Sequence, residues 1–349
     1  TGWPLRRSAL QRLAPGAALG CSNNPRFSFL KREILEKYQV FIYLAAIVCG
    51  LLIGTVLPNR VGALEWVLWP VLGLLLYTTF TQVPLIHLRE AFGNFRFIAA
   101  AVVGNFVLLP FVVWGLMAMA PNEPAVRLGL LLVLLVPCTD WFITFTHLGG
   151  GDTKHAIAFS PVSLILQIVF LPFYLWLFLG SEFTANLAQK EMFMAFLGLI
   201  VLPLLAAFMT EKWVEAGPRR RHVIDRLAWL PVPLLALVVF SIAAAQVGIV
   251  MDSAGLLGHL LLIFGAFLVI AGLVSRALAL VFNLPPLQGR VLAFSLGSRN
   301  SFVVLPLALA LPASYELAVV VIVFQSLVEL FGMVAYLWWV PKKLFPAAA

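Results

Sequence analysis

Apolar runs long enough to cross a lipid bilayer recur from Val40 to near the end of the chain. A helix rises 1.5 Å per residue, so about 20 apolar residues cover the roughly 30 Å of a hydrocarbon core. Of the 349 residues, 62% are apolar and 11% are charged, whereas average soluble domains carry about 25% charged residues. The sequence therefore predicts an all-α polytopic membrane protein and excludes a soluble enzyme with an anchor or a disulfide-rich secreted scaffold.

The apolar runs predict ten transmembrane helices. Turn-forming residues mark several joints between them, including Pro58-Asn59 and Pro285-Pro286. The predicted spans are residues 39–57, 64–83, 96–119, 126–148, 156–180, 191–210, 227–250, 257–282, 290–311 and 316–339.

The distribution of Lys and Arg predicts the orientation of the chain. With a cytoplasmic N-terminus, 19 of the 23 Lys and Arg residues fall in inner segments and three fall in outer loops. Cytoplasmic loops retain positive charge, so both termini are expected to be cytoplasmic, as in a protein of the plasma membrane. The basic pI near 9.7 then reflects contact with the lipid bilayer, and no nucleic-acid partner is expected.

Symmetry divides the predicted helices into two groups of five. We expect residues 1–37 to form an irregular cytoplasmic tail, residues 38–180 the first five-helix repeat, residues 181–341 the second, and residues 342–349 a cytoplasmic C-terminal tail. The first repeat starts inside and the second starts outside, so the two form an inverted repeat. Helix 4 then corresponds to helix 9.

The fourth predicted span contains a proline break followed by polar side chains, Pro137-Cys138-Thr139-Asp140. Proline removes one backbone hydrogen bond and frees carbonyl groups that can face a cavity. A charge near the bilayer centre costs about 2.5 to 3.5 kcal/mol on insertion scales, so Asp140 is expected to be functional. For Cys138 alone, the alternative is a buried thiol that packs as a small hydrophobe beside a proline kink.

The ninth predicted span carries a lone arginine among small polar residues, Gly297-Ser298-Arg299-Asn300-Ser301. This composition indicates an unwound segment that presents polar backbone groups to a site. Because helix 9 corresponds to helix 4, Arg299 is expected to pair with Asp140 where the broken helices cross. The pair could serve structure alone, since a buried charge requires a partner. Arg299 could equally hold an anionic substrate.

Glu329 lies in the middle of the tenth predicted span. Apolar surroundings favour the neutral form of a carboxyl group, so Glu329 can gain and lose a proton near neutral pH, which suits proton coupling. The alternative is a permanently neutral side chain that is hydrogen-bonded to a neighbouring helix. Most of the buried amides are expected to hold helices together; they are Asn105, Gln167, Gln246 and Gln325.

We predict no cofactor, no metal site and no enzymatic activity. Cys21, Cys49 and Cys138 are too far apart in sequence to indicate a disulfide framework or a zinc site. The sequence has no phosphate-binding glycine loop and no metal-ligand cluster. Nothing outside the predicted spans is large enough to hold an active site.

These residues resemble those of the arsenite permeases of the bile acid/arsenite/riboflavin transporter superfamily, over residues 34–341. The most specific point is Pro137-Cys138-Thr139 followed by Gly149-Gly150-Gly151-Asp152, because that family carries a Pro-Cys-Thr element and a later Gly-Asp. Glu329 falls where the family has a glutamate in its last helix. The resemblance implies two inverted five-helix repeats with broken helices 4 and 9 crossing at mid-membrane, and it implies that Cys138 contacts arsenite.

Two segments depart from the arsenite permeases. Asp140 stands where those proteins look apolar, and Arg299-Asn300-Ser301 stands where they have two asparagines followed by Phe-Glu. Asn300-Ser301 is closer to the bile acid symporters, yet Ser295 stands where that branch has a sodium-binding carboxylate. Arg299 could therefore act as a built-in cation, and we expect protons rather than sodium as the coupling ion.

The first hypothesis is a secondary transporter that exports arsenite or antimonite in exchange for protons. Arsenite is largely neutral at pH 7, so a soft sulfur with hydroxyl and amide partners suits it. The alternative is a carrier of a small organic anion whose carboxylate binds Arg299; a sensor or channel has little support, because no large cytoplasmic domain is predicted. The predicted substrate-binding residues are Cys138, Thr139, Ser298, Arg299, Asn300 and Ser301, with Glu329 and Asp140 for proton coupling and Pro137 and Gly297 as helix breaks.

Overall fold

The computed structural model describes residues 25–56, 61–85, 94–187, 194–217, 220–248 and 254–346. The chain divides into two units, Thr1–Lys37 and Tyr38–Ala349, and the helix packing and the site described below lie within the second unit. Residues 1–24 and 347–349 of the predicted tails, and the predicted joint at Pro58-Asn59, lie outside the described residues.

The first helix begins earlier than the sequence predicted. Helix α1 comprises Pro25–Val56, so residues 25–37, which we expected in an irregular tail, are helical. The physical reason is local: this stretch is rich in Leu, Lys, Arg and Glu, which have high helix propensity, and it starts with a proline, which is favoured at the first helical position.

The first half of the chain forms helices at each predicted span. Helices α4, η3 and α5 are continuous and cover the third span, whereas α6 and α7 are the separate halves of the fourth. Helix α8 passes through Pro161 and Pro172 and extends beyond the predicted end at residue 180. The helices after α1 are α2 (Val61–Phe80), α4 (Phe95–Val103), the π-helix η3 (Gly104–Leu108), α5 (Leu109–Leu116), α6 (Pro124–Leu134), α7 (Trp141–Leu148) and α8 (Thr153–Leu187).

The second half follows the same pattern, and α15 and α16 are the two halves of the ninth span. Its helices are the π-helix η4 (Leu197–Val201), α10 (Leu202–Glu215), α11 (Arg221–Leu227), α12 (Pro231–Ala245), α14 (Ala254–Val281), α15 (Pro286–Gly297), α16 (Ser301–Leu309), the 3-10 helix η6 (Ala313–Tyr315), α17 (Glu316–Trp339) and the π-helix η7 (Val340–Leu344).

Six helical segments among the described residues are long and apolar enough to cross a membrane. Three shorter apolar helices accompany them: Phe41–Val56, Trp66–Phe80 and Pro124–Leu134. The chain is therefore an all-helical, multi-pass membrane protein. The six segments are Phe95–Leu116, Thr153–Phe178, Met194–Glu215, Arg221–Ala245, Gly255–Val281 and Ala313–Leu344.

Helices α1 and α12 pack with their backbones in close contact. A Cβ atom at Gly50 would collide with the carbonyl oxygen of Phe240, and one at Gly54 would collide with that of Ala244. Small residues four positions apart allow membrane helices to approach in this way. Helix α12 also packs against α2, and α2 packs against α10, so α1, α2, α10 and α12 form one helix group.

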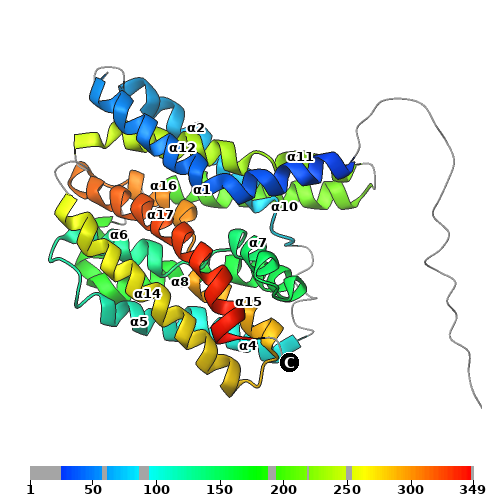
Figure 1. Cartoon of the computed structure of the whole chain (residues 1–349). Coiled ribbons are helices and arrows are strands. Elements are labelled where there is room, and N and C mark those ends of the chain that lie inside the picture. Colours follow the sequence, from blue (N-terminus) through cyan, green and yellow to red (C-terminus); the bar gives the residue numbers. More distant parts are fainter. Residues whose placement is uncertain are drawn as a thin grey trace, which may run out of the picture. The chain divides into compact units, whose positions relative to one another are not determined.

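Helix α17 connects the elements that surround the two broken helices. It packs against α6, α14 and α16, and Figure 1 shows α14 and α17 side by side. Helix α14 in turn packs against α15, and α15 against α7. These contacts bring the polar centre of α17 next to both helix breaks.

Candidate functional site

Both helices that were predicted to break do so, and each break is bounded by short helices. Helix α6 ends at Leu134 and α7 begins at Trp141, so the chain between them, which contains Pro137, is not helical. Helix α15 ends at Gly297, and α16 begins at Ser301. The polar residues singled out in the fourth and ninth predicted spans therefore lie in or next to unwound backbone.

The two breaks are joined to each other by backbone hydrogen bonds. The N–H of Cys138 donates to the carbonyl oxygen of Ser298 at 3.1 Å, and the N–H of Asn300 donates to that of Val136 at 2.8 Å. The two segments thereby form an antiparallel bridge. Buried N–H groups that a broken helix leaves free are satisfied in this way by the partner helix.

Gly297 is required where α15 passes α17. A Cβ atom there would lie 2.6 Å from the Tyr336 ring and 2.9 Å from the methyl carbon of Met333. The glycine thus allows the second break to sit directly against α17, which carries Glu329.

Arg299 is 3% exposed, and its guanidinium group donates to protein oxygens. Nη2 donates to Asn105 Oδ1 at 2.8 Å, to the Leu296 carbonyl at 2.9 Å and to the Ser295 carbonyl at 3.0 Å, while Nη1 donates to the Leu134 carbonyl at 3.4 Å. Leu134 ends α6, and the other two carbonyls belong to the last turn of α15. The guanidinium therefore balances the negative carbonyl ends of both broken helices.

The remaining surroundings of Arg299 leave little of the guanidinium open to a substrate. Its Nε has no hydrogen-bond partner and is buried, and its Cζ lies 5.4 Å from the centre of the Phe267 ring. With Nη1 and Nη2 already engaged, a substrate carboxylate would have to displace protein oxygens. The pairing of Arg299 with Asp140 stays a prediction.

Glu329 accepts hydrogen bonds from the second break and from its own helix. Its Oε2 accepts from the backbone N–H of Arg299 and from Nε2 of Gln325, both at 2.8 Å. The hydroxyl of Ser301 donates to Oε1 of Gln325 at 2.6 Å. A chain of three side chains therefore connects the start of α16 to a carboxyl group that is 3% exposed.

The first break carries a thiol beside a carboxylate. Cys138 is 2% exposed, and its Sγ donates to Asp140 Oδ1 at 3.3 Å. Asp140 is partly exposed and occupies the N-cap position of α7 without capping it through its side chain. Thr139 accepts two hydrogen bonds: its Oγ1 accepts from Nδ2 of Asn300 at 3.3 Å, and its backbone carbonyl accepts from the Ser160 hydroxyl.

Aromatic side chains cover the start of α7. The rings of Tyr43 and Trp141 are stacked with centroids 5.9 Å apart, and Trp141 also lies 5.4 Å from Phe302. Trp141 directly follows Asp140 in the chain, so this aromatic group lies at the start of α7, where the first break ends. This group could not be predicted from the sequence, because its three members come from three distant helices.

Two amides have closer roles than the general helix contacts predicted for them. Asn105 binds the Arg299 guanidinium and also donates from Nδ2 to the Ser295 hydroxyl at 3.1 Å. Gln325 links Ser301 to Glu329. The spacing of four residues between Gln325 and Glu329 on one helix face is a signal that could have identified this pair; no comparable signal marks Asn105.

The glycine turn after α7 is held by a buried arginine. Nη1 of Arg290 donates to the carbonyls of Gly150 at 2.9 Å and Gly149 at 3.4 Å, and its Nε donates to the Phe345 carbonyl at 3.0 Å. Gly150 has a φ of 65°, a conformation that favours glycine. Arg290 is 9% exposed and connects α15 to this turn.

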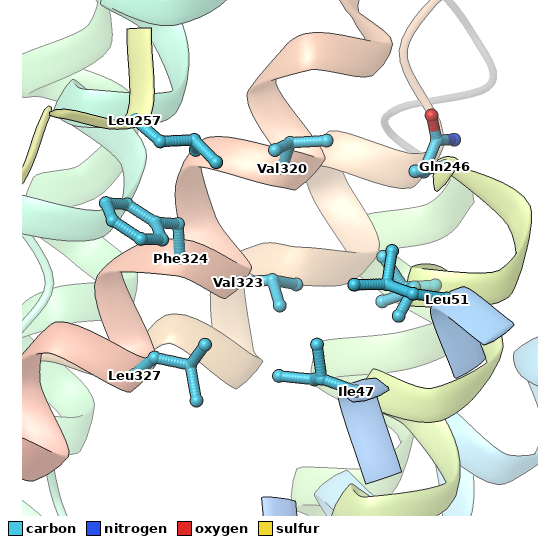
Figure 2. Close-up of a pocket in the computed structure, with 10 residues that line it drawn as sticks. Ile47, Leu51, Gln246, Leu257, Val320, Val323, Phe324 and Leu327 are labelled. Atoms are coloured by element: carbon cyan, nitrogen blue, oxygen red, sulfur yellow. The ribbon is translucent and has the colours of Figure 1, made fainter. Parts of the chain in front are cut away.

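An apolar pocket with an empty volume of about 440 Å³ lies between α1, α12, α14 and α17. In Figure 2, Ile47 and Leu51 of α1 face Val323 and Leu327 of α17 across it. Its one polar lining residue is Gln246, beyond the end of α12. The remaining lining residues are Ile242, Ala243, Leu257, Val320 and Phe324.

One protein family matches the chain over more than half of its length. The match, to the Sodium Bile acid symporter family, covers residues 69–253. It includes Cys138 and Asp140 and ends before Arg299 and Glu329. No curated protein shows significant similarity to the chain. Symporters are transporters rather than enzymes, and the match supports the superfamily without selecting the arsenite permeases within it. Consistent with its helical, multi-pass architecture, the chain belongs to the sodium bile acid symporter family.

Proposed function

We propose that this transporter exports a neutral metalloid hydroxide, arsenite or antimonite, across the plasma membrane in exchange for protons. The proposed architecture is ten transmembrane helices in two inverted repeats, residues 38–180 and 181–341, with cytoplasmic tails at residues 1–37 and 342–349. The broken helices that meet at the Cys138–Ser298 hydrogen bond support this arrangement, since helix breaks at mid-membrane form the sites of inverted-repeat transporters.

The observation that carries the proposal is the thiol of Cys138 beside the carboxylate of Asp140, at 3.3 Å within the first break. A soft sulfur ligand suits arsenic(III) and antimony(III). An anionic substrate would meet the negative charge of Asp140, whereas a neutral trihydroxide can donate hydrogen bonds to it. The hydroxyl and amide groups of Thr139 and Asn300 would face the other oxygens of the substrate.

The thiol can bind the substrate by a reversible exchange. Asp140 takes the proton from Cys138, the thiolate sulfur forms a bond to arsenic, and one arsenic–hydroxyl bond breaks. The leaving hydroxide takes the proton from Asp140 and departs as water. Attack by water reverses the step and releases the trihydroxide, so a single thiol holds the substrate without trapping it.

Proton exchange at Glu329 and Asp140 would supply the driving force. Glu329 contacts the second break through the Arg299 backbone, and it is connected to Ser301 through Gln325. A change in its protonation would therefore alter hydrogen bonds at the second break, which is bonded to the first break at Cys138. The apolar pocket between α1, α12, α14 and α17 is a place where the α1, α2, α10 and α12 group could slide during alternating access.

The test is arsenite uptake by everted membrane vesicles that carry an imposed proton gradient. We expect uptake by the native protein and by Cys49→Ser, a matched control because Cys49 is an exposed thiol on α1. Uptake should be lost in Cys138→Ser and should collapse when a proton uncoupler is added. Full uptake by Cys138→Ser would refute the role of the thiol, and a native protein that moves no arsenite would refute the substrate.

A carrier of a small organic anion is the second candidate, because the family match names bile acids and the pocket in Figure 2 is apolar. In that candidate, Arg299 binds the substrate carboxylate. The hydrogen bonds from its guanidinium to Asn105 and to three carbonyl groups argue against this role. Bile acid uptake in the same vesicles, abolished by Arg299→Gln, would favour the second candidate over the first.

A further inference from the structure

The carbonyl ends of two helices converge on one point in this protein. The carbonyl groups of Leu134, at the end of α6, and of Ser295 and Leu296, in the last turn of α15, all face the Arg299 guanidinium. The amide oxygen of Asn105 completes the set. Unwound carbonyls and the C-terminal ends of half-helices are the groups with which membrane transporters coordinate sodium ions.

We propose that Arg299 is a resident cation, whose guanidinium fills an oxygen site that would otherwise take a monovalent metal ion, so that transport by this chain does not require sodium. This inference does not depend on the identity of the substrate. The match to the family includes Asn105 and Leu134 and ends before Ser295, Leu296 and Arg299.

Three features make the guanidinium a fixed part of the fold. Its contacts to four oxygens span 2.8 to 3.4 Å, its Cζ lies over the Phe267 ring, and its own backbone N–H is held by Glu329. A sodium ion that drives transport must leave its site in each cycle, whereas a side chain remains tethered. The Arg299 side chain therefore occupies a site of the kind that binds a coupling ion, and its hydrogen bonds link α6, α15 and η3 permanently.

Removal of the guanidinium should open the site to a free ion. In Arg299→Ala, the oxygens of Asn105, Ser295 and Leu296 lose their donor while remaining close together. Arg299→Gln also removes the guanidinium, but it keeps one amide donor and is therefore the more conservative substitution. Arg299→Lys is the matched control, since it keeps a tethered cation, and Arg221→Gln removes one positive charge from an exposed position on α11.

The experiment is thermal unfolding of the purified full chain in sodium chloride and in choline chloride, each at about 150 mM, so that ionic strength is equal. The native protein, Arg299→Lys and Arg221→Gln should each have the same Tm in both salts. Arg299→Ala and Arg299→Gln should unfold at a lower temperature in choline, and sodium should raise their Tm by about 2–4 °C in a saturable way.

Two results would overturn the proposal. One is a native protein whose Tm rises in sodium over choline, because the site would then already accept a free ion. The other is an Arg299→Gln protein that is folded and monodisperse yet gives the same Tm in both salts, because the oxygens would then form no cation site. No arsenite is present in this assay, so its failure is separate from failure of the proposed substrate.

Discussion

Substitutions at Glu329 separate the packing role of a buried acid from its role in proton exchange. One oxygen of this side chain accepts two hydrogen bonds, from the Arg299 backbone and from Gln325, both at 2.8 Å. Glu329→Gln keeps an acceptor oxygen in this place, whereas Glu329→Leu removes it and leaves two buried donors unsatisfied. Each such donor costs about 1–3 kcal/mol, so the leucine variant should lose about 2–6 kcal/mol of stability and the glutamine variant less than about 1 kcal/mol.

Thermal unfolding of the purified variants measures the first half of this prediction. Glu329→Leu should unfold well below the native protein, and Glu329→Gln should unfold close to it. Equal unfolding temperatures for the two variants would show that the Glu329 oxygen does not satisfy these donors as the geometry indicates.

Vesicle transport measures the second half. Glu329→Gln cannot exchange a proton, so it should still equilibrate arsenite down its own gradient while losing accumulation driven by a pH gradient. Accumulation at the native level by this folded variant would remove Glu329 from the coupling mechanism and leave Asp140 as the remaining carboxyl for that role.

Substitutions at three further positions test individual contacts by thermal unfolding. Asn105→Ala removes an acceptor from the buried Arg299 and should cost about 1.5–3 kcal/mol; an unchanged Tm would mean that this hydrogen bond contributes nothing. Gly297→Ala places a methyl group against the Tyr336 ring and should cost about 1–3 kcal/mol; native stability would show that α15 and α17 are not in close contact there. Gly150→Ala forces a residue with a Cβ atom into a φ of 65° and should cost about 1–2 kcal/mol, with a smaller loss for Gly150→Asn, and equal losses would contradict a backbone origin.

The positions of the helices could be predicted from the sequence because membrane helices follow local hydrophobicity. Every predicted span overlaps helical residues among those described. The predicted start of the first helix was wrong by more than ten residues, because α1 begins at Pro25. A helix can continue past its apolar run when the flanking residues favour helix. Hydropathy therefore predicts the part of a helix that lies in the hydrocarbon core and does not predict how far the helix extends beyond it.

The two helix breaks were predictable from the sequence, whereas the hydrogen-bond partners of the residues beside them were not. Pro137 marks the first break because proline removes a backbone hydrogen bond, and Gly297 marks the second as the last residue of α15. The partners of Arg299 were not predictable, since they depend on how η3 and the ends of α6 and α15 meet in space. A lone charged residue in an apolar span indicates that the charge has partners in the fold. Every residue carries a backbone carbonyl, so the sequence does not show which carbonyls accept its hydrogen bonds.

The bridge between the two breaks is formed by backbone groups. Its hydrogen bonds run from the N–H groups of Cys138 and Asn300 to backbone carbonyls, so this bridge does not depend on the side chains at positions 138 and 300, and the Asn300 amide adds one further bond to Thr139. Substitutions at these two positions should therefore alter the chemistry of the site while the backbone bridge between the broken helices persists. Proline is the exception at positions 138 and 300, because it alone lacks the N–H that fastens the two helices together.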